Sequence, residues 1–210
     1  SSNTVYLWTE ASDSPTNYTV RGSTTDEGIT ASDVDYVNIE NLDIRHQNDF
    51  SIYLDNCSYI TIDGCIINDA GLNGILLENG SSNHVTVSNN TIQGASQNGL
   101  KMYGTYNVVT NNTINNIGTF ENVSANGFGH ENEMYAILML GQYSEVLYNN
   151  ITNIGYSGIR LTTAPDSKVH YNYLYNTCHL KDDGGAIYTW NSSLSDPGCQ
   201  NTTIKYNIIE

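Results

Sequence analysis

The sequence predicts an all-β solenoid of three sheets and about seven rungs, organised as a single domain over residues 1–210. Apolar residues, most of them β-branched, recur at a spacing of about 22 to 25 residues, which is typical of solenoids. Each repeat holds three such residues, so each turn of the coil has three inward faces. The three columns are Ile29, Ile52, Ile75, Leu100, Ile137, Ile159 and Ile187; Ile39, Ile62, Val87, Val109, Val146, Val169 and Ile204; and Ile44, Ile67, Ile92, Ile114, Ile151, Leu174 and Ile209.

A fourth series lies between the second and third columns and ends in asparagines. Its members are Leu42, Cys65, Asn90, Asn112, Asn149, Asn172 and Asn207. Rungs of parallel strands lie about 4.8 Å apart, so amide side chains in register can hydrogen-bond along the coil axis. We therefore expect an internal asparagine ladder. Helical repeats fit poorly, because no segment shows apolar residues at helical spacing for long enough to form a helix.

Three copies of one motif carry a resemblance to a known family. VSNNTI, VTNNTI and VLYNNI each join a second-column residue, a ladder asparagine and a third-column residue. Across essentially all of the chain, this pattern resembles the right-handed parallel β-helix of pectate-lyase-like proteins. The resemblance implies a right-handed parallel β-helix with three sheets, and it says more about fold than about function.

Composition restricts the partners of this chain. The net charge is −15, with only seven Lys and Arg and no basic patch, so we expect no nucleic-acid partner. The sequence holds no run of 18 apolar residues, so we expect no membrane span. The first and last rungs look open, which leads us to expect either a fragment of a longer chain or a unit that associates end to end in a filament.

Sequons and cysteines predict an extracellular or cell-surface glycoprotein. Several sequon asparagines lie beside the ladder position, where the side chain points outward and is open to glycosylation. Four cysteines are compatible with an oxidising compartment. We expect a disulfide between Cys178 and Cys199, whereas Cys57 and Cys65 can be paired or unpaired. The sequons are at Asn17, Asn56, Asn79, Asn89, Asn111, Asn122, Asn150, Asn191 and Asn201.

Two insertions interrupt the repeat at the same corner, between the third column and the next first-column residue. They span residues 115–136 and 175–186, with one regular rung between them. Loops that leave one corner two rungs apart are separated by about 10 Å, so we expect them to form the walls of a cleft. The outward residues of the first-column strands form its floor. Functional groups commonly collect on loops held by a rigid scaffold.

The two walls carry acidic, basic and aromatic residues. We expect Asp182, Asp183, Glu131 and Glu133 to be the catalytic carboxylates, since glycoside hydrolysis needs two carboxyl groups about 5 to 9.5 Å apart. Aromatic faces stack on sugar rings, and cations bind acidic groups. The expected substrate-binding residues are His130, Tyr135, Tyr156, Arg160, His179, Lys181, Tyr188 and Trp190.

A second resemblance covers roughly residues 137–210. The segment KDDGGAIYTW, preceded by GYSGIRL and VHYNYLYN, is similar to a signature of β-helix proteins associated with polysaccharide breakdown, including xylosidase-like hydrolases. That resemblance implies an acidic catalytic role for Asp182 or Asp183. The alternative without a catalytic role is that Asp-Asp-Gly-Gly forms an ordinary turn with Gly at positive φ, and that Glu131 and Glu133 are solvated.

The sequence thus leaves two functions open. One is a carbohydrate-active protein that binds a polysaccharide or other glycan, as a hydrolase in preference to a lyase, with Arg160 and Lys181 neutralising a uronate in the lyase alternative. The other is a non-catalytic, glycosylated module of a cell-surface layer or filament. We expect no cofactor. A calcium ion bound by loop carboxylates is conceivable, although no D-x-D-x-D-G pattern supports it.

Overall fold

The computed structural model describes residues 22–78, 82–120, 133–191 and 198–210, and within them 21 strands form three sheets of seven strands each. The first sheet comprises β1 (Glu27–Ser32), β4 (Phe50–Asp55), β7 (Ile75–Glu78), β10 (Leu100–Tyr103), β13 (Ile137–Leu140), β16 (Ile159–Thr162) and β19 (Ile187–Trp190). The second comprises β2 (Asn38–Glu40), β5 (Thr61–Asp63), β8 (Thr86–Ser88), β11 (Val108–Thr110), β14 (Glu145–Leu147), β17 (Lys168–His170) and β20 (Thr203–Lys205). The third comprises β3 (Asp43–Arg45), β6 (Ile66–Asn68), β9 (Thr91–Gln93), β12 (Thr113–Ile117), β15 (Asn150–Ile154), β18 (Tyr173–Tyr175) and β21 (Ile208–Ile209).

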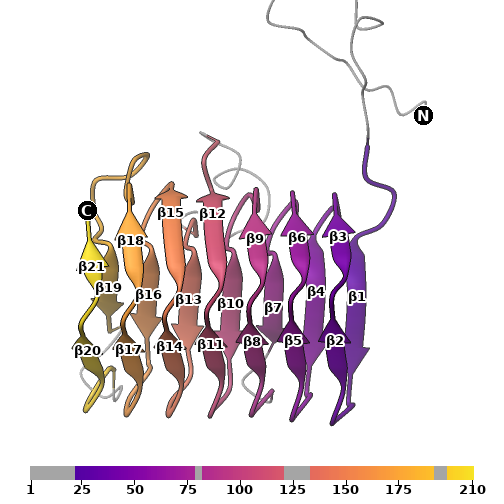
Figure 1. Cartoon of the computed structure of the whole chain (residues 1–210), viewed down its shortest axis with the longest axis horizontal. Helices are drawn as coiled ribbons and strands as arrows, with labels where there is room; N and C mark the ends of the chain where they lie inside the picture. The colour runs from indigo at the N-terminus through magenta and orange to yellow at the C-terminus, as the bar shows by residue number, and fades with distance from the viewer. Residues whose placement is uncertain (1–21, 79–81, 121–132, 192–197) are drawn as a thin grey trace, which may run out of the picture.

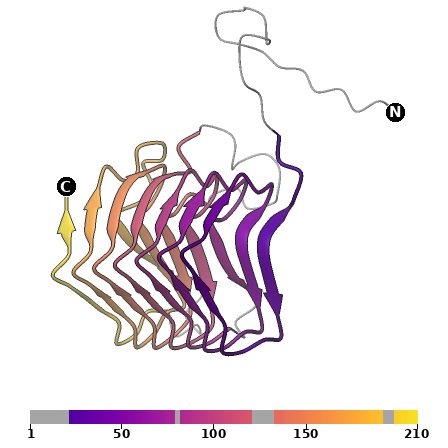
Figure 2. The same cartoon turned by 45° about the vertical axis from the view of Figure 1, so that its right-hand side comes forward.

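Every third strand pairs in parallel with its counterpart in the next rung, so the chain winds as a right-handed parallel β-helix of seven rungs (Figures 1 and 2). The predicted columns are the observed registers: Ile137 faces Ile159, Val146 faces Val169, and Ile151 faces Leu174. These residues are fully buried inside the coil. The predicted fold class is therefore confirmed. Among the described residues, no helix is long and apolar enough to cross a membrane.

The asparagine ladder is present between the second and third sheets. Asn90 Nδ2 donates to Asn112 Oδ1 at 3.0 Å, Asn112 Nδ2 to Asn149 Oδ1 at 3.0 Å, and Asn149 Nδ2 to Asn172 Oδ1 at 2.9 Å. Asn207 continues the ladder, and its Oδ1 accepts from Asn172 Nδ2 at 3.0 Å. Each amide also bonds to backbone groups, so these polar side chains are satisfied inside the coil.

Two columns of exposed rings follow the outer corners of the coil. Tyr148, Tyr171 and Tyr206 stack at centroid spacings of 4.9 and 5.1 Å. A longer stack of five rings lies at the corner between the first and second sheets. All eight residues have φ between 54° and 60°, in the left-handed region that non-glycine residues seldom occupy. The members of the longer stack are Tyr36, Tyr59, His84, Tyr106 and Tyr143.

Candidate functional site

A second apolar cluster lies outside the coil, apart from the main core. It consists of Met134, Tyr135, Leu138 and Tyr156, with Leu140, Cys178 and Leu180 packed against it. Leu138 lies on the outward face of β13 and is 3% exposed. The described ends of both insertions therefore pack on the outside of the first sheet, because their apolar residues bury this surface. This cluster fixes the floor of the site.

Glu133 attaches the end of the first insertion to β10. Its carboxylate accepts hydrogen bonds from Lys101 Nζ at 2.9 and 3.1 Å and from Asn98 Nδ2 at 2.9 Å. Asn98 is fully buried, and it also donates to Asn73 and accepts from the backbone N–H of Tyr135. Buried ionised groups require such partners. The structure thus places Glu133 in a hydrogen-bond network with Lys101 and Asn98, and its catalytic role stays a prediction.

Arg160 extends from the outward face of β16 into a group of aromatic rings. Its guanidinium carbon lies 5.0 Å from the ring centroid of Tyr135, 5.6 Å from that of Tyr188 and 5.4 Å from that of Trp190. One Nη1–H donates to the hydroxyl of Tyr135, and Nε–H donates to Thr162 Oγ1 at 3.3 Å. Cation–π contacts and these two hydrogen bonds fix the plane of the guanidinium.

Tyr156 supports the second insertion from below. Its hydroxyl donates to the backbone oxygen of Asp183, and its backbone oxygen accepts from the N–H of Cys178 at 2.7 Å. A Cβ on Gly184 would lie 2.5 Å from a ring carbon of Tyr156, so only glycine allows this packing. The φ of Gly184 and of Gly185 is not positive, so the expectation of glycines at positive φ in this turn is wrong. Close approach to Tyr156 is the physical reason for Gly184.

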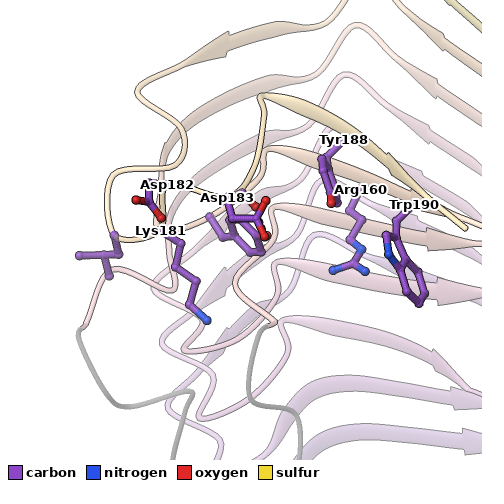
Figure 3. Close-up of a pocket in the computed structure, with 8 residues that line it drawn as sticks. Arg160, Lys181, Asp182, Asp183, Tyr188 and Trp190 are labelled. Carbon is purple, nitrogen blue, oxygen red and sulfur yellow. Dashed lines mark hydrogen bonds between the residues drawn. The ribbon is translucent and has the colours of Figure 1, made fainter. Parts of the chain in front are cut away.

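These groups surround a cavity of about 440 Å³, called here the Arg160 cavity. Asp182 and Asp183 lie on one side, and Arg160 and Trp190 lie on the other (Figure 3). Lys181 Nζ lies 5.7 Å from the ring centroid of Tyr156. The cavity brings together two carboxylates, two cations and three aromatic rings on a rigid sheet. Its lining residues are Tyr156, Arg160, Leu180, Lys181, Asp182, Asp183, Tyr188 and Trp190.

Burial keeps the two supporting phenols protonated. It raises the pKa of Tyr135 to about 12, although the charge and hydrogen bond of Arg160 act in the opposite direction. Burial also raises the pKa of Tyr156, and the nearby Asp183 carboxylate adds to this effect. At neutral pH both hydroxyls are therefore neutral. Tyr156 is then a hydrogen-bond donor to the turn that carries the carboxylates.

The structure brings most of the predicted site residues together and separates a few of them. Tyr135 is fully buried, does not line the cavity and hydrogen-bonds to Arg160. Glu133 and His179 do not line the cavity, and His179 is exposed. His130 and Glu131 lie outside the described residues. The predicted residues that do line it are Tyr156, Arg160, Lys181, Asp182, Asp183, Tyr188 and Trp190.

Sequence reasoning missed Leu180 and the Asn73–Asn98–Glu133 network. The available signal for the network was the pair of motifs NGI and NGL, which place Asn73 and Asn98 at the same offset before successive first-column residues. Leu180 was passed over because a single apolar residue within a polar insertion has no periodicity. Its backbone N–H bonds to Gly155 O at 3.0 Å, which holds the turn on the coil.

The predicted disulfide is wrong: Cys178 and Cys199 are not joined. Cys178 follows β18 and packs in the outer cluster, whereas Cys199 lies beyond the other end of β19 and packs against the main core. Four residues of extended strand separate the two corners by roughly 13 Å, and a disulfide requires Cα atoms within about 7 Å. Cys57 and Cys65 are buried at separate positions in the coil and are not paired either.

Six sequon asparagines lie within the described residues, and all six are exposed, consistent with their predicted outward position. They are Asn56, Asn89, Asn111, Asn150, Asn191 and Asn201. Asn17, Asn79 and Asn122 lie outside the described residues. Across the described ranges, no three His, Cys, Asp or Glu side chains are placed to hold a metal ion together.

Comparison with solved structures finds the same fold in polysaccharide-modifying enzymes. The alginate lyase from Paenibacillus sp. str. FPU-7 superposes with a TM-score of 0.69 at 18% identity, over 90% of this chain and 65% of that one. Pectate lyase Pel9A gives 0.62 at 12% identity, over 82% and 46%. The A-module of the Azotobacter vinelandii mannuronan C-5 epimerase AlgE4 gives 0.54 at 17% identity, over 84% and 53%. The chain thus spans less than two thirds of each of these proteins.

A search of curated proteins finds no match to this sequence. A family model does match, and it covers the chain from residue 1 to residue 210. Its description is "Periplasmic copper-binding protein (NosD)". The match therefore extends over all seven rungs. The chain belongs to the NosD family of right-handed β-helix proteins.

Proposed function

We propose that this protein binds a glycan in the Arg160 cavity and hydrolyses it, with Asp182 or Asp183 as catalytic acid. The observation that carries the proposal is the composition of the cavity, in which exposed carboxylates face aromatic rings across a rigid sheet. Sugar rings bind through apolar faces on aromatic side chains and through a few polar groups that fix their orientation. The alginate lyase, pectate lyase and epimerase named above share the fold, which supports a carbohydrate ligand.

Hydrolysis assigns a distinct task to each side of the cavity. Trp190 and Tyr188 would hold the sugar ring, while a protonated Asp182 or Asp183 donates its proton to the glycosidic oxygen as that C–O bond breaks. A second carboxylate takes a proton from the water that forms the new C–O bond to the sugar. Lys101 and Asn98 occupy the carboxylate of Glu133, so the other aspartate or Glu131 is the better candidate for this base.

A lyase is the second candidate, favoured by the two cations of the cavity. Arg160 and Lys181 would neutralise the carboxylate of a uronate and so acidify the proton on the adjacent carbon. Removal of that proton by a base expels the glycosidic oxygen on the next carbon, leaving a double bond in one product. The two reactions thus differ in their products, since hydrolysis leaves no such double bond.

A non-catalytic surface or filament module is the third candidate. It is favoured by the structural use of Glu133, which leaves Asp182 and Asp183 as the only carboxylates that line the cavity among the described residues. End-to-end association of copies is part of this alternative. Extracellular or surface location is proposed for all three candidates, supported by the periplasmic protein in the family description and by the exposed sequons.

The family description also names copper. Copper is bound in proteins by His, Cys and Met side chains in small clusters. The described cysteines and histidines do not form such a cluster, and no described group of three His, Cys, Asp or Glu side chains fits a metal ion. Calcium at the loop carboxylates stays a proposal. No step of the proposed reaction depends on a metal.

The test is incubation of the protein with a panel of neutral and acidic polysaccharides, followed by assays for new reducing ends and for unsaturated products. Hydrolysis predicts new reducing ends without unsaturation. Asp182→Asn and Asp183→Asn, singly and combined, should abolish turnover, while Glu145→Gln on the second sheet is the matched control. Full turnover in the double variant would remove these aspartates from catalysis, and unsaturated products would favour the lyase.

A further inference from the structure

We infer that Arg160 recognises a carboxylate on the bound sugar, so the cavity selects acidic over neutral glycans. The inference rests on the proposed glycan-binding function and narrows its substrate class. A guanidinium has five N–H groups, and Arg160 uses one for Thr162 and one for Tyr135. The remaining three have no partner among the described residues. Because Arg160 lines the cavity, these N–H groups are available to a ligand bound there.

Of the three other cations on strands of the first and second sheets, two pair with carboxylates, and the third, Lys205, is exposed to solvent. Lys101 pairs with Glu133 at 2.9 Å and Lys168 pairs with Glu145 at 2.6 Å. Arg160 has no carboxylate within ion-pair distance in the described part of the chain, although the net charge is −15 and acidic residues are abundant. It is also half-buried, where an uncompensated charge is costly. A ligand carboxylate would supply the missing partner.

The geometry around Arg160 selects a carboxylate attached to a ring. Guanidinium and carboxylate match as planar groups through two parallel hydrogen bonds. The rings of Tyr188 and Trp190 lie 5.6 and 5.4 Å from the guanidinium carbon, on the same wall. A pyranose ring whose carboxylate meets Arg160 therefore places an apolar face near these aromatics. Hexuronate units have this shape, and Lys181 also lines the cavity.

The guanidinium is also held in place before a ligand arrives. Tyr135 is fully buried and accepts a hydrogen bond from Arg160, and its backbone N–H bonds to Asn98, which Glu133 also contacts. The chain of contacts from Glu133 to Arg160 thus fixes the plane that the carboxylate must meet. Preorganisation of this kind lowers the entropy cost of binding. Glu133 is in this sense a positioning residue.

The experiment compares tetrasaccharides of galacturonate and of mannuronate with their methyl esters, which have the same rings but no charge. Binding is measured by calorimetry on the Asp182→Asn/Asp183→Asn protein, so that cleavage does not interfere. We expect one of the acids to bind about tenfold or more tightly than its ester. Arg160→Gln should remove this preference, whereas Lys205→Gln, which removes one exposed cation, should keep it.

Equal affinity of acid and ester in the Asp182→Asn/Asp183→Asn protein with Arg160 intact would overturn the inference, whatever the result for the Arg160→Gln variant. Retention of the preference in a folded Arg160→Gln protein would do so as well. Binding of esters or neutral glycans alone would leave the proposed glycan site standing without its acidic specificity. If no glycan bound in any form, both the proposed function and this inference would fall.

Discussion

The side-chain amide of Asn112 donates a hydrogen bond to Asn149 Oδ1 at 3.0 Å, although 37 residues separate the two asparagines. The 115–136 insertion therefore leaves the ladder in register. We predict that Asn149→Ala lowers the free energy of unfolding by about 3 kcal/mol, because Asn112 and two carbonyl groups lose their buried partners. Urea denaturation measures the change. Asn150→Ala, on the outward side, should stay within about 0.5 kcal/mol, and equal effects of the two would contradict a buried ladder.

The pair formed by Lys101 and Glu133 gives the second prediction. Their side chains are 9% and 18% exposed, so removal of one partner leaves a buried charge without compensation. We expect Glu133→Ala to cost about 3 kcal/mol in urea denaturation. Combining it with Lys101→Met should recover part of that loss, since no charge then remains. A fully stable Glu133→Ala protein would show that Glu133 is free for other tasks.

The five-ring stack predicts which of two substitutions at Tyr106 gives the more stable protein. Tyr106 contacts His84 and Tyr143 at centroid spacings of 5.0 and 5.1 Å, and its φ is 58°. Ala and Gly both remove the stacking, but Ala keeps a Cβ in the left-handed region. We expect Tyr106→Gly to be about 1 kcal/mol more stable than Tyr106→Ala by thermal or urea denaturation. The reverse order would show that the left-handed backbone is relaxed in the variants.

Tyr135 makes stability depend on pH in the alkaline range. Burial raises its pKa in the folded protein to about 12, and an unfolded tyrosine titrates near 10. The raised pKa therefore contributes fully to the free energy of unfolding below pH about 10, and this stabilisation is lost as the pH rises toward about 12. Tyr135→Phe should therefore flatten the fall in unfolding free energy across that window. Parallel curves for the two proteins, measured by urea denaturation at several pH values, would contradict the assigned burial.

The fold was predictable because it is encoded by repetition. Ile159, Val169 and Asn172 recur in register with earlier rungs, and parallel pairing allows a single arrangement that buries all three columns. The left-handed corners, such as that at Tyr106, could not be predicted in the same way. Tyrosine carries no propensity for positive φ, so the corner conformation depends on the stacked neighbours rather than on the residue itself.

The site was predictable in its location but not in its details. Two insertions at one corner pointed to the outward face of the first sheet, where Arg160, Tyr188 and Asp183 line the cavity. The roles of Tyr135 and Glu133 depended on side-chain packing in the outer cluster, which follows no sequence period. The disulfide prediction was based on both cysteines being close to β19 in sequence. It failed because Cys178 and Cys199 lie at opposite ends of that strand.

The measurement that tests the central claim most directly is nuclear magnetic resonance of labelled Asp182→Asn/Asp183→Asn protein titrated with a glycan selected from the binding panel. The indole N–H signal of Trp190 is assigned by its loss in Trp190→Phe. We predict that the Trp190 indole and the Arg160 Nε–H shift on titration, while backbone amides of Tyr59 and Tyr106, in the five-ring stack at another corner, stay in place. Shifts confined to that stack, with Trp190 and Arg160 unmoved, would contradict the assignment of the Arg160 cavity as the glycan site.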